Sequence, residues 1–277
     1  MFREALRALG YRDDVIEIEA RFADDHFQPL PDFAAELVHL SPEVIVAASP
    51  PVVAALKQLT STNPTVMTSA GDPDGLGFVA SLAHPGGNIT GLSTQSQDMA
   101  GKWVEMLTIT VPGAKRIAFL VNPTNPADAA VLEGAKQAAQ SLSVELLPIE
   151  ARTPDELDGA LTAIARERVD GLIGWGDPVF SLERRRIVGF AAIHKLPAIY
   201  QFQDYVAVGG LMSFGPDLND LNRRTAAYVD KIPQRCQASR SAGRATNQIL
   251  PGRQLEGGAG ARPNNSTITS RARRRSY

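Results

Sequence analysis

The sequence predicts an α/β protein made of two lobes, each built on a doubly wound parallel sheet. Short apolar runs rich in Val, Ile and Leu alternate with helical patterns along residues 2–232, as in parallel sheets with crossover helices. The alternation starts again after residue 93, which gives two consecutive halves of the same kind. The composition is that of a globular chain, with 44% hydrophobic and 21% charged residues among 277.

The first half, residues 1–93, begins with a helix that Gly10 ends, since glycine is favoured just past a helix C-terminus. Residues 44–48 (VIVAA) are continuously apolar, which is typical of a strand buried on both faces. A doubly wound lobe normally opens with a strand at the centre of its sheet. Because this sequence starts inside a helix, we expect the first lobe to lack its first strand. The expected helices are 2–9, 31–40, 51–59 and 75–82, and the expected strands are 15–20, 44–48, 65–68 and 88–93.

The second half, residues 94–232, repeats the alternation and includes the crossings between the lobes. Thr153 is the expected cap of one helix, with Pro154 in its first turn. A final helix closes the body. The expected helices are 97–107, 127–142, 154–168, 181–194 and 217–232, and the expected strands are 116–121, 144–149, 171–175, 197–201 and 210–214.

The last 45 residues, 233–277, differ in composition from the body. They contain nine arginines and one glutamate, a net charge of +8, while residues 1–232 carry −10. Low hydrophobicity and high arginine content predict a disordered tail. Such a basic tail also suits nucleic-acid binding, an interpretation that we reject below.

Five loops follow predicted strands at the edge where open α/β sheets bind ligands. Each combines proline with small or hydrogen-bonding residues, which suits a rigid loop that presents backbone N–H groups to a carboxylate. The same residues are also common in helix caps and turns, but five such loops at one edge favour a shared cleft. The candidate ligand-binding residues from these loops are Ser49, Pro50, Ser69, Ala70, Asp72, Asn122, Asn125, Asp177 and Tyr200.

Signals for other classes of protein are weak. The sequence has no dinucleotide, P-loop or hydrolase motif, so we expect neither an enzyme nor a cofactor. Its one cysteine, Cys236, and four scattered histidines predict no metal site. Asp72 and Asp177 are a possible acid–base pair, but no nucleophile accompanies them. No apolar run is long enough to span a bilayer.

Four stretches carry a resemblance to a known family: VIVAASPPVVAALKQLTSTNPTVM, SAGDPDGLGFVASLAHPGGNITGLST, FLVNPTNP and LPAIYQFQDYVAVGGLMSFGPD. Together they resemble the ABC-transporter substrate-binding proteins of the family that includes tryptophan and tyrosine binders. The resemblance covers nearly all of residues 2–232. It implies a type I periplasmic binding fold, in which two lobes close by a hinge on a small amino acid-like or carboxylate-bearing solute. It further implies permease and ATPase partners and contacts from the loop residues named above.

The sequence departs from the family pattern at both ends. It begins without the signal peptide and first strand of family members, so the chain as written would stay cytoplasmic although the family is periplasmic. Read one base later with suitable synonymous codons, residues 233–252 can encode the family's own continuation. We therefore expect a frame-shifted tail whose basic charge has no nucleic-acid role. The alternatives left open are a non-functional truncated remnant, a small-molecule enzyme and a ligand-sensing core on the same fold.

Overall fold

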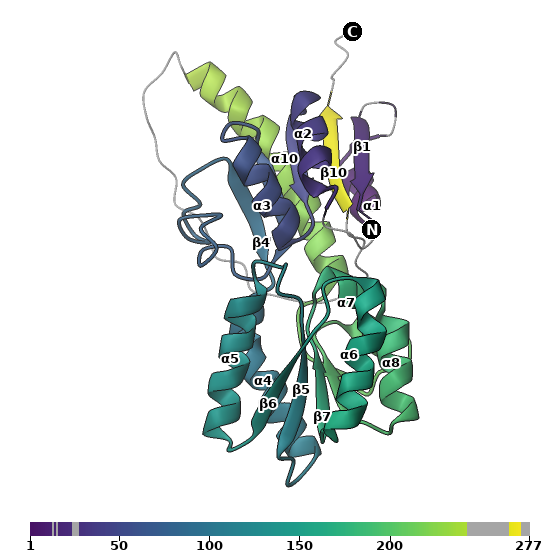
Figure 1. Ribbon diagram of the computed structural model, residues 1–277. Helices are drawn as coiled ribbons and strands as arrows, with labels where there is room; N and C mark the ends of the chain where they lie inside the picture. The colour runs from purple at the N-terminus through teal and green to yellow at the C-terminus, as the bar shows by residue number, and fades with distance from the viewer. Residues whose placement is uncertain (13, 15, 24–27, 243–265, 273–277) are drawn as a thin grey trace.

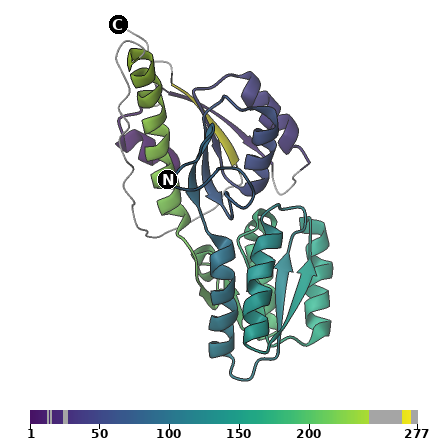
Figure 2. The same cartoon turned by 90° about the vertical axis from the view of Figure 1, so that its left-hand side faces the viewer.

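Two five-stranded sheets, one in each of two lobes, organise the chain. The computed structural model describes residues 1–12, 14, 16–23, 28–242 and 266–272, and for residues 233–242 and 266–272 it describes the backbone alone. The two lobes lie end to end, with the first lobe above the second in Figures 1 and 2. The predicted α/β class with two mostly parallel sheets is confirmed.

The first lobe contains the sheet of strand order β1-β10-β2-β3-β4. Its strands are β1 (Ile16–Phe22), β2 (Val44–Ala47), β3 (Thr65–Ala70), β4 (Ile89–Ser93) and β10 (Ser266–Ala272). The helices that pack on it are α1 (Phe2–Ala8), α2 (Leu30–His39), α3 (Pro50–Leu59) and α10 (Leu218–Ala242).

Helices cover both faces of this sheet, and side chains alternate between the two faces. Ile45 and Met67 pack in a cluster with residues of α2 and α3. Val46 and Val66 pack in a second cluster with residues of α1 and α10. Since successive side chains of a strand point to opposite faces, a strand covered on both sides must be apolar throughout. This explains the unbroken apolar run of β2, all of whose residues are buried.

The second lobe contains the sheet of order β6-β5-β7-β8-β9, in which every described pairing is parallel. Its core includes Trp103, whose Nε1 donates a hydrogen bond to the Phe214 carbonyl at 2.7 Å. The strands are β5 (Arg116–Val121), β6 (Glu145–Glu150), β7 (Gly171–Gly174), β8 (Ala198–Tyr200) and β9 (Met212–Ser213). The helices are α4 (Ser96–Thr110), α5 (Asp128–Ser141), α6 (Pro154–Glu167), α7 (Pro178–Leu182), α8 (Arg184–Ile193) and α9 (Gln203–Val206).

Three local expectations differ from the structure. Residues 75–82 form turns and not a helix: the Asp72 carboxylate accepts a hydrogen bond from Gly75 N–H, and Gly77 has a φ of +65°. The helix expected at 181–194 is divided at Glu183 into α7 and α8. The short helix α9 follows β8, where no helix was expected.

The tail also differs from the expectation at two places. Helix α10 continues to Ala242, and residues 266–272 form β10, an inner strand of the first sheet between β1 and β2, in the lobe where a strand was expected to be missing. Strand β10 runs antiparallel to both neighbours, β1 and β2. A gap between two strand edges exposes unpaired backbone groups on both sides, which gives an extended segment a place to pair. The predicted disorder of residues 243–265 and 273–277 lies outside the described residues.

The chain passes from the first lobe to the second between β4 and α4, and returns between β9 and α10. Helix α10 packs against α1 and β3 of the first lobe, although the sequence analysis grouped it with the second. Figure 2 shows α10 starting between the lobes and running along the first. Within the described part of the chain, no helix has the length and apolarity needed to cross a membrane.

Candidate functional site

A cavity lies between the two lobes, where both crossings of the chain meet it. Its volume is about 50 Å³, room for a few water molecules. The first lobe contributes Ala48, Ser49, Pro50, Thr68, Ser69 and Gly71, and the crossings contribute Thr94, Ser96, Leu218 and Asn222. The second lobe contributes Asn125, Trp175, Gly176, Pro178, Ser181, Gln201 and Phe202.

The first-lobe wall is built on the N-terminus of α3. Ser49 is the N-cap of this helix, but its side chain makes no capping hydrogen bond, and prolines occupy the next two positions. Since Pro50 and Pro51 have no N–H and Val53 N–H donates to the Ser49 carbonyl, Val52 carries the N–H that a cap would normally satisfy. The partial positive charge of a helix N-terminus favours an anion here.

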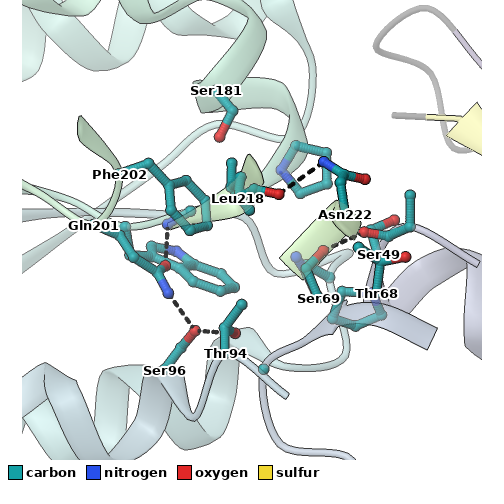
Figure 3. A pocket seen from close by; sticks show the side chains of 17 residues that line it. Ser49, Thr68, Ser69, Thr94, Ser96, Ser181, Gln201, Phe202, Leu218 and Asn222 are labelled. Carbon is teal, nitrogen blue, oxygen red and sulfur yellow. Dashed lines mark hydrogen bonds between the residues drawn. The ribbon is translucent and has the colours of Figure 1, made fainter. Parts of the chain in front are cut away.

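A hydrogen-bonded brace forms the opposite wall and ties the crossing segment to the second lobe. Gln201 Nε2 donates to Ser96 Oγ at 2.7 Å, and its Oε1 accepts from Gly176 N–H at 2.7 Å. Ser96 Oγ and Thr94 Oγ1 also share a hydrogen bond of 2.8 Å. In Figure 3 this brace faces Ser49 and Ser69 across the cavity. Gln201 therefore fixes the end of β8 relative to the hinge.

Asp177 lies behind the cavity wall and holds two asparagines in place. Its carboxylate accepts hydrogen bonds from Asn125 Nδ2 at 2.8 Å and from Asn122 Nδ2 at 3.2 Å, and it caps α7 through Val179 N–H at 2.8 Å. Asp177 is fully buried, so these donors replace the water that its charge would otherwise need. Of this group Asn125 lines the cavity.

Burial perturbs two carboxyl groups in this region. It raises the pKa of Asp177 to about 6, although the Asn125 and Asn122 amides and the Val179 N–H favour the charged form. Burial likewise raises the pKa of Asp128 to about 6, against the opposing effect of the Asn122 backbone N–H. Both groups therefore gain protons within the range between pH 7 and pH 5.

Two buried polar atoms on the second-lobe wall, Ser181 Oγ and Trp175 Nε1, lack a hydrogen bond of good geometry within the described residues. The Tyr205 hydroxyl lies near Ser181 Oγ, and the Asp128 carboxyl lies near Trp175 Nε1. A buried donor without a partner is costly, which a bound polar group would relieve. Figure 3 shows the Ser181 hydroxyl pointing toward the space beside Phe202.

The structure brings four of the nine residues predicted from the sequence to the cavity wall, namely Ser49, Pro50, Ser69 and Asn125. The other five have structural contacts. Ala70 accepts hydrogen bonds through its carbonyl, and Asp72 accepts one from Gln97 Nε2 at 3.2 Å. Asn122 and Asp177 bond to each other, and Tyr200 stacks on Tyr205 with ring centroids 4.4 Å apart.

Sequence reasoning did not select several residues that line the cavity. Thr94 and Ser96 directly follow β4, so the strand-end rule that selected the other loops could have found them. Trp175 directly follows β7, so the same rule could have found it. Asn222 lies on α10, four residues after the start of the helix, and no pattern in the sequence indicates it. Among the described residues, no three His, Cys, Asp or Glu side chains gather into a metal site.

Three relatives resemble this chain in sequence or structure. A tyrosine-binding protein of Clostridioides difficile (strain R20291) is 26% identical over 83% of this chain, which spans 66% of that protein's length. A conserved domain protein of Vibrio cholerae has a TM-score of 0.78 and 28% identity, covering 83% of this chain and 77% of its own. The ABC domain from Streptococcus pneumonia in complex with L-Trp has a TM-score of 0.76 and 23% identity, covering 84% and 78%.

The match to a protein family extends over most of the chain. Residues 2–239 fit the sequence profile of the family described as ABC transporter substrate binding protein. The TM-scores of 0.78 and 0.76 show that the chain shares its fold with the two solved structures above. The chain therefore belongs to the ABC transporter substrate-binding protein family.

Proposed function

We propose that this chain is the solute-binding component of an ABC importer and binds a carboxylate-bearing, amino acid-like solute between its lobes. The observation that carries the proposal is the cavity walled by both lobes, with the uncapped N-terminus of α3 on one side. The solute's carboxylate docks at Ser49 Oγ and Val52 N–H, where the helix dipole favours it. The partners of the chain are the permease and ATPase subunits of the importer, and the chain acts outside the cytoplasmic membrane.

The opposite wall suits the rest of an aromatic amino acid. Trp175 and Phe202 provide flat apolar surface, and Ser181 Oγ provides a hydroxyl that makes no hydrogen bond of good geometry within the described residues. Aromatic rings stack favourably against such side chains. The names of two relatives, a tyrosine-binding protein and a domain in complex with L-Trp, support the same class of solute. An enzyme that uses Asp72 or Asp177 receives no support, because neither side chain lines the cavity.

Calorimetric titration of the purified chain with L-tyrosine and L-tryptophan tests the proposal. We expect binding of at least one of them, and roughly tenfold or more weaker binding of tyramine and tryptamine, which lack the carboxylate that charge-assisted hydrogen bonds would hold. Ser49→Ala should weaken binding of the amino acid and leave binding of the corresponding amine unaffected. Ser93→Ala is the matched control, since Ser93 Oγ bonds to the Ala70 carbonyl away from the cavity.

Two outcomes would contradict the proposal. Equal affinity for an amino acid and its decarboxylated amine would exclude docking of the carboxylate at α3. A chain that is folded by circular dichroism yet binds no aromatic amino acid or aromatic carboxylate would favour the non-functional remnant that the sequence left open.

A further inference from the structure

We propose that the first lobe contains a strand-acceptor site between β1 and β2, which residues 266–272 of the same chain fill as an exchangeable strand. In Figure 1, β10 is the yellow arrow between the purple β1 and the rest of the sheet. Strand β1 lies near the start of the sequence and β10 near its end. Segments that are separated by most of the sequence therefore pair in this sheet. The site is the pair of strand edges on either side of β10.

A comparison of the two lobes indicates that this position is a distinct site. The sheet of the second lobe has the order β6-β5-β7-β8-β9, and its inner strand β5 runs parallel to both neighbours. The sheet of the first lobe follows the same plan, but β10 occupies the position of β5 and runs antiparallel to both neighbours. The two framing strands are thus arranged as in the other lobe, and the occupant comes from elsewhere in the sequence.

The two edges of the site depend on their occupant. All seven residues of β1 pair with β10, and β1 pairs with no other described strand. On the other side, residues 268–270 of β10 pair with β2. Strands in a sheet lie about 4.8 Å apart, so an empty site would leave β1 and β2 one strand too far apart to pair. Each would then expose a row of unpaired N–H and C=O groups.

The sequence of the occupant indicates that backbone pairing holds it. Residues 266–272 read STITSRA and contain one large aliphatic residue, whereas β5, in the equivalent position, reads RIAFLV. Inner strands of covered sheets are normally apolar throughout. A strand that gains its affinity from main-chain hydrogen bonds is the mode of binding known as β-augmentation. Such a strand can exchange with a second strand of the same kind.

A disulfide trap in the full chain tests the occupant. Glu19 and Thr269 are directly opposed, and opposed residues place their Cβ atoms within about 5.5 Å, close enough for a disulfide. With Cys236→Ser in every variant, Glu19→Cys plus Thr269→Cys should form a disulfide within one chain. Ile16→Cys plus Ser266→Cys is the control, because these residues lie at opposite ends of the paired strands. Cross-linking no faster than this control, or only between two copies, would overturn the assignment.

A competition experiment tests exchange at the same site. A fluorescein-labelled peptide of residues 266–272 should bind the reduced Glu19→Cys, Thr269→Cys protein and fail to bind its disulfide-locked form. The same peptide with alternate N-methylated amides should not bind, because it cannot donate the ladder hydrogen bonds. Equal binding to the locked and reduced forms, binding of the methylated peptide, or no binding to the reduced form would each overturn the acceptor site.

Discussion

Asp177 shows how one side chain can shape a site that it does not line. Its carboxylate fixes the Asn125 amide that faces the cavity and caps α7 on the other side. Sequence reasoning selected Asp177 because it follows β7 at the edge where ligands bind. It could not distinguish a carboxylate that faces the cleft from one that braces the loop, since both use the same residue in the same place. Burial settles that distinction.

The raised pKa of Asp177 gives the unfolding free energy an unusual pH dependence. In the folded state this carboxyl takes up a proton near pH 6, and in the unfolded state near its ordinary value of 3.8. The folded state therefore binds more protons between these values, and stability rises as the pH falls from 7 to 5. We expect a gain of roughly 1 kcal/mol from this group, measured by urea unfolding at the two pH values.

Variants separate this contribution from those of other carboxyls. Asp177→Asn should remove the gain, so that the unfolding free energy of the parent relative to the variant increases by roughly 1 kcal/mol from pH 7 to pH 5. Asp170→Asn is the control, because the Lys115 and Arg116 backbone N–H groups lower the pKa of Asp170, so that its contribution stays constant from pH 7 to pH 5. Its contribution is present at pH 7 and is lost as the pH falls through that lowered value. An unchanged slope in Asp177→Asn would contradict the assignment.

At the scale of single elements, the start of α6 was predicted in detail. Thr153 Oγ1 accepts a hydrogen bond from Glu156 N–H, as the sequence predicted for its cap, and Pro154 occupies the first turn. Thr153→Ala should lower the unfolding free energy by about 1 kcal/mol, as measured by chemical denaturation. Thr162→Ala is the control, because Thr162 lies in the middle of the same helix. This substitution should change the unfolding free energy by less than about 0.5 kcal/mol. Equal losses would mean that the cap contributes nothing specific.

Strands such as β2 and β5 could be predicted because each is a short run of apolar residues, whereas the conformation of residues 75–82 could not. A helix was expected at 75–82, and two apolar residues of this segment, Phe78 and Val79, are buried in the cluster with α2 and α3. Their backbone is fixed instead by turns, with Phe78 N–H bonded to the Pro73 carbonyl. The apolar side chains of this segment are buried, as their type predicts. The turns at Gly75 and Gly77 give its backbone a non-helical conformation. The position of β10 could not be predicted either, because it depends on an opening between two distant strands.

At the scale of the whole molecule, the small cavity implies motion. Ligand sites usually measure about 300–1,000 Å³, whereas this cavity measures about 50 Å³, so the lobes must separate to admit an amino acid. By small-angle X-ray scattering, we expect the ligand-free protein to have a larger radius of gyration than the structure described above. Saturation with the ligand identified by calorimetry should reduce it, because closed lobes bury the solute. If the radius of gyration of the ligand-free protein matches that of the structure, an open resting state is excluded.

Residues beside the two crossings between the lobes also line the cavity: Thr94 and Ser96 beside one, and Leu218 and Asn222 in the first turns of α10 beside the other. A solute in this position contacts residues that flank the joint between the lobes. Substitutions that adapt the site to a new solute therefore alter the stiffness of the joint as well. Affinity for the solute and the rate of its release are therefore coupled in this architecture. Substitutions that change specificity without changing the joint would be confined to residues on the two lobe walls.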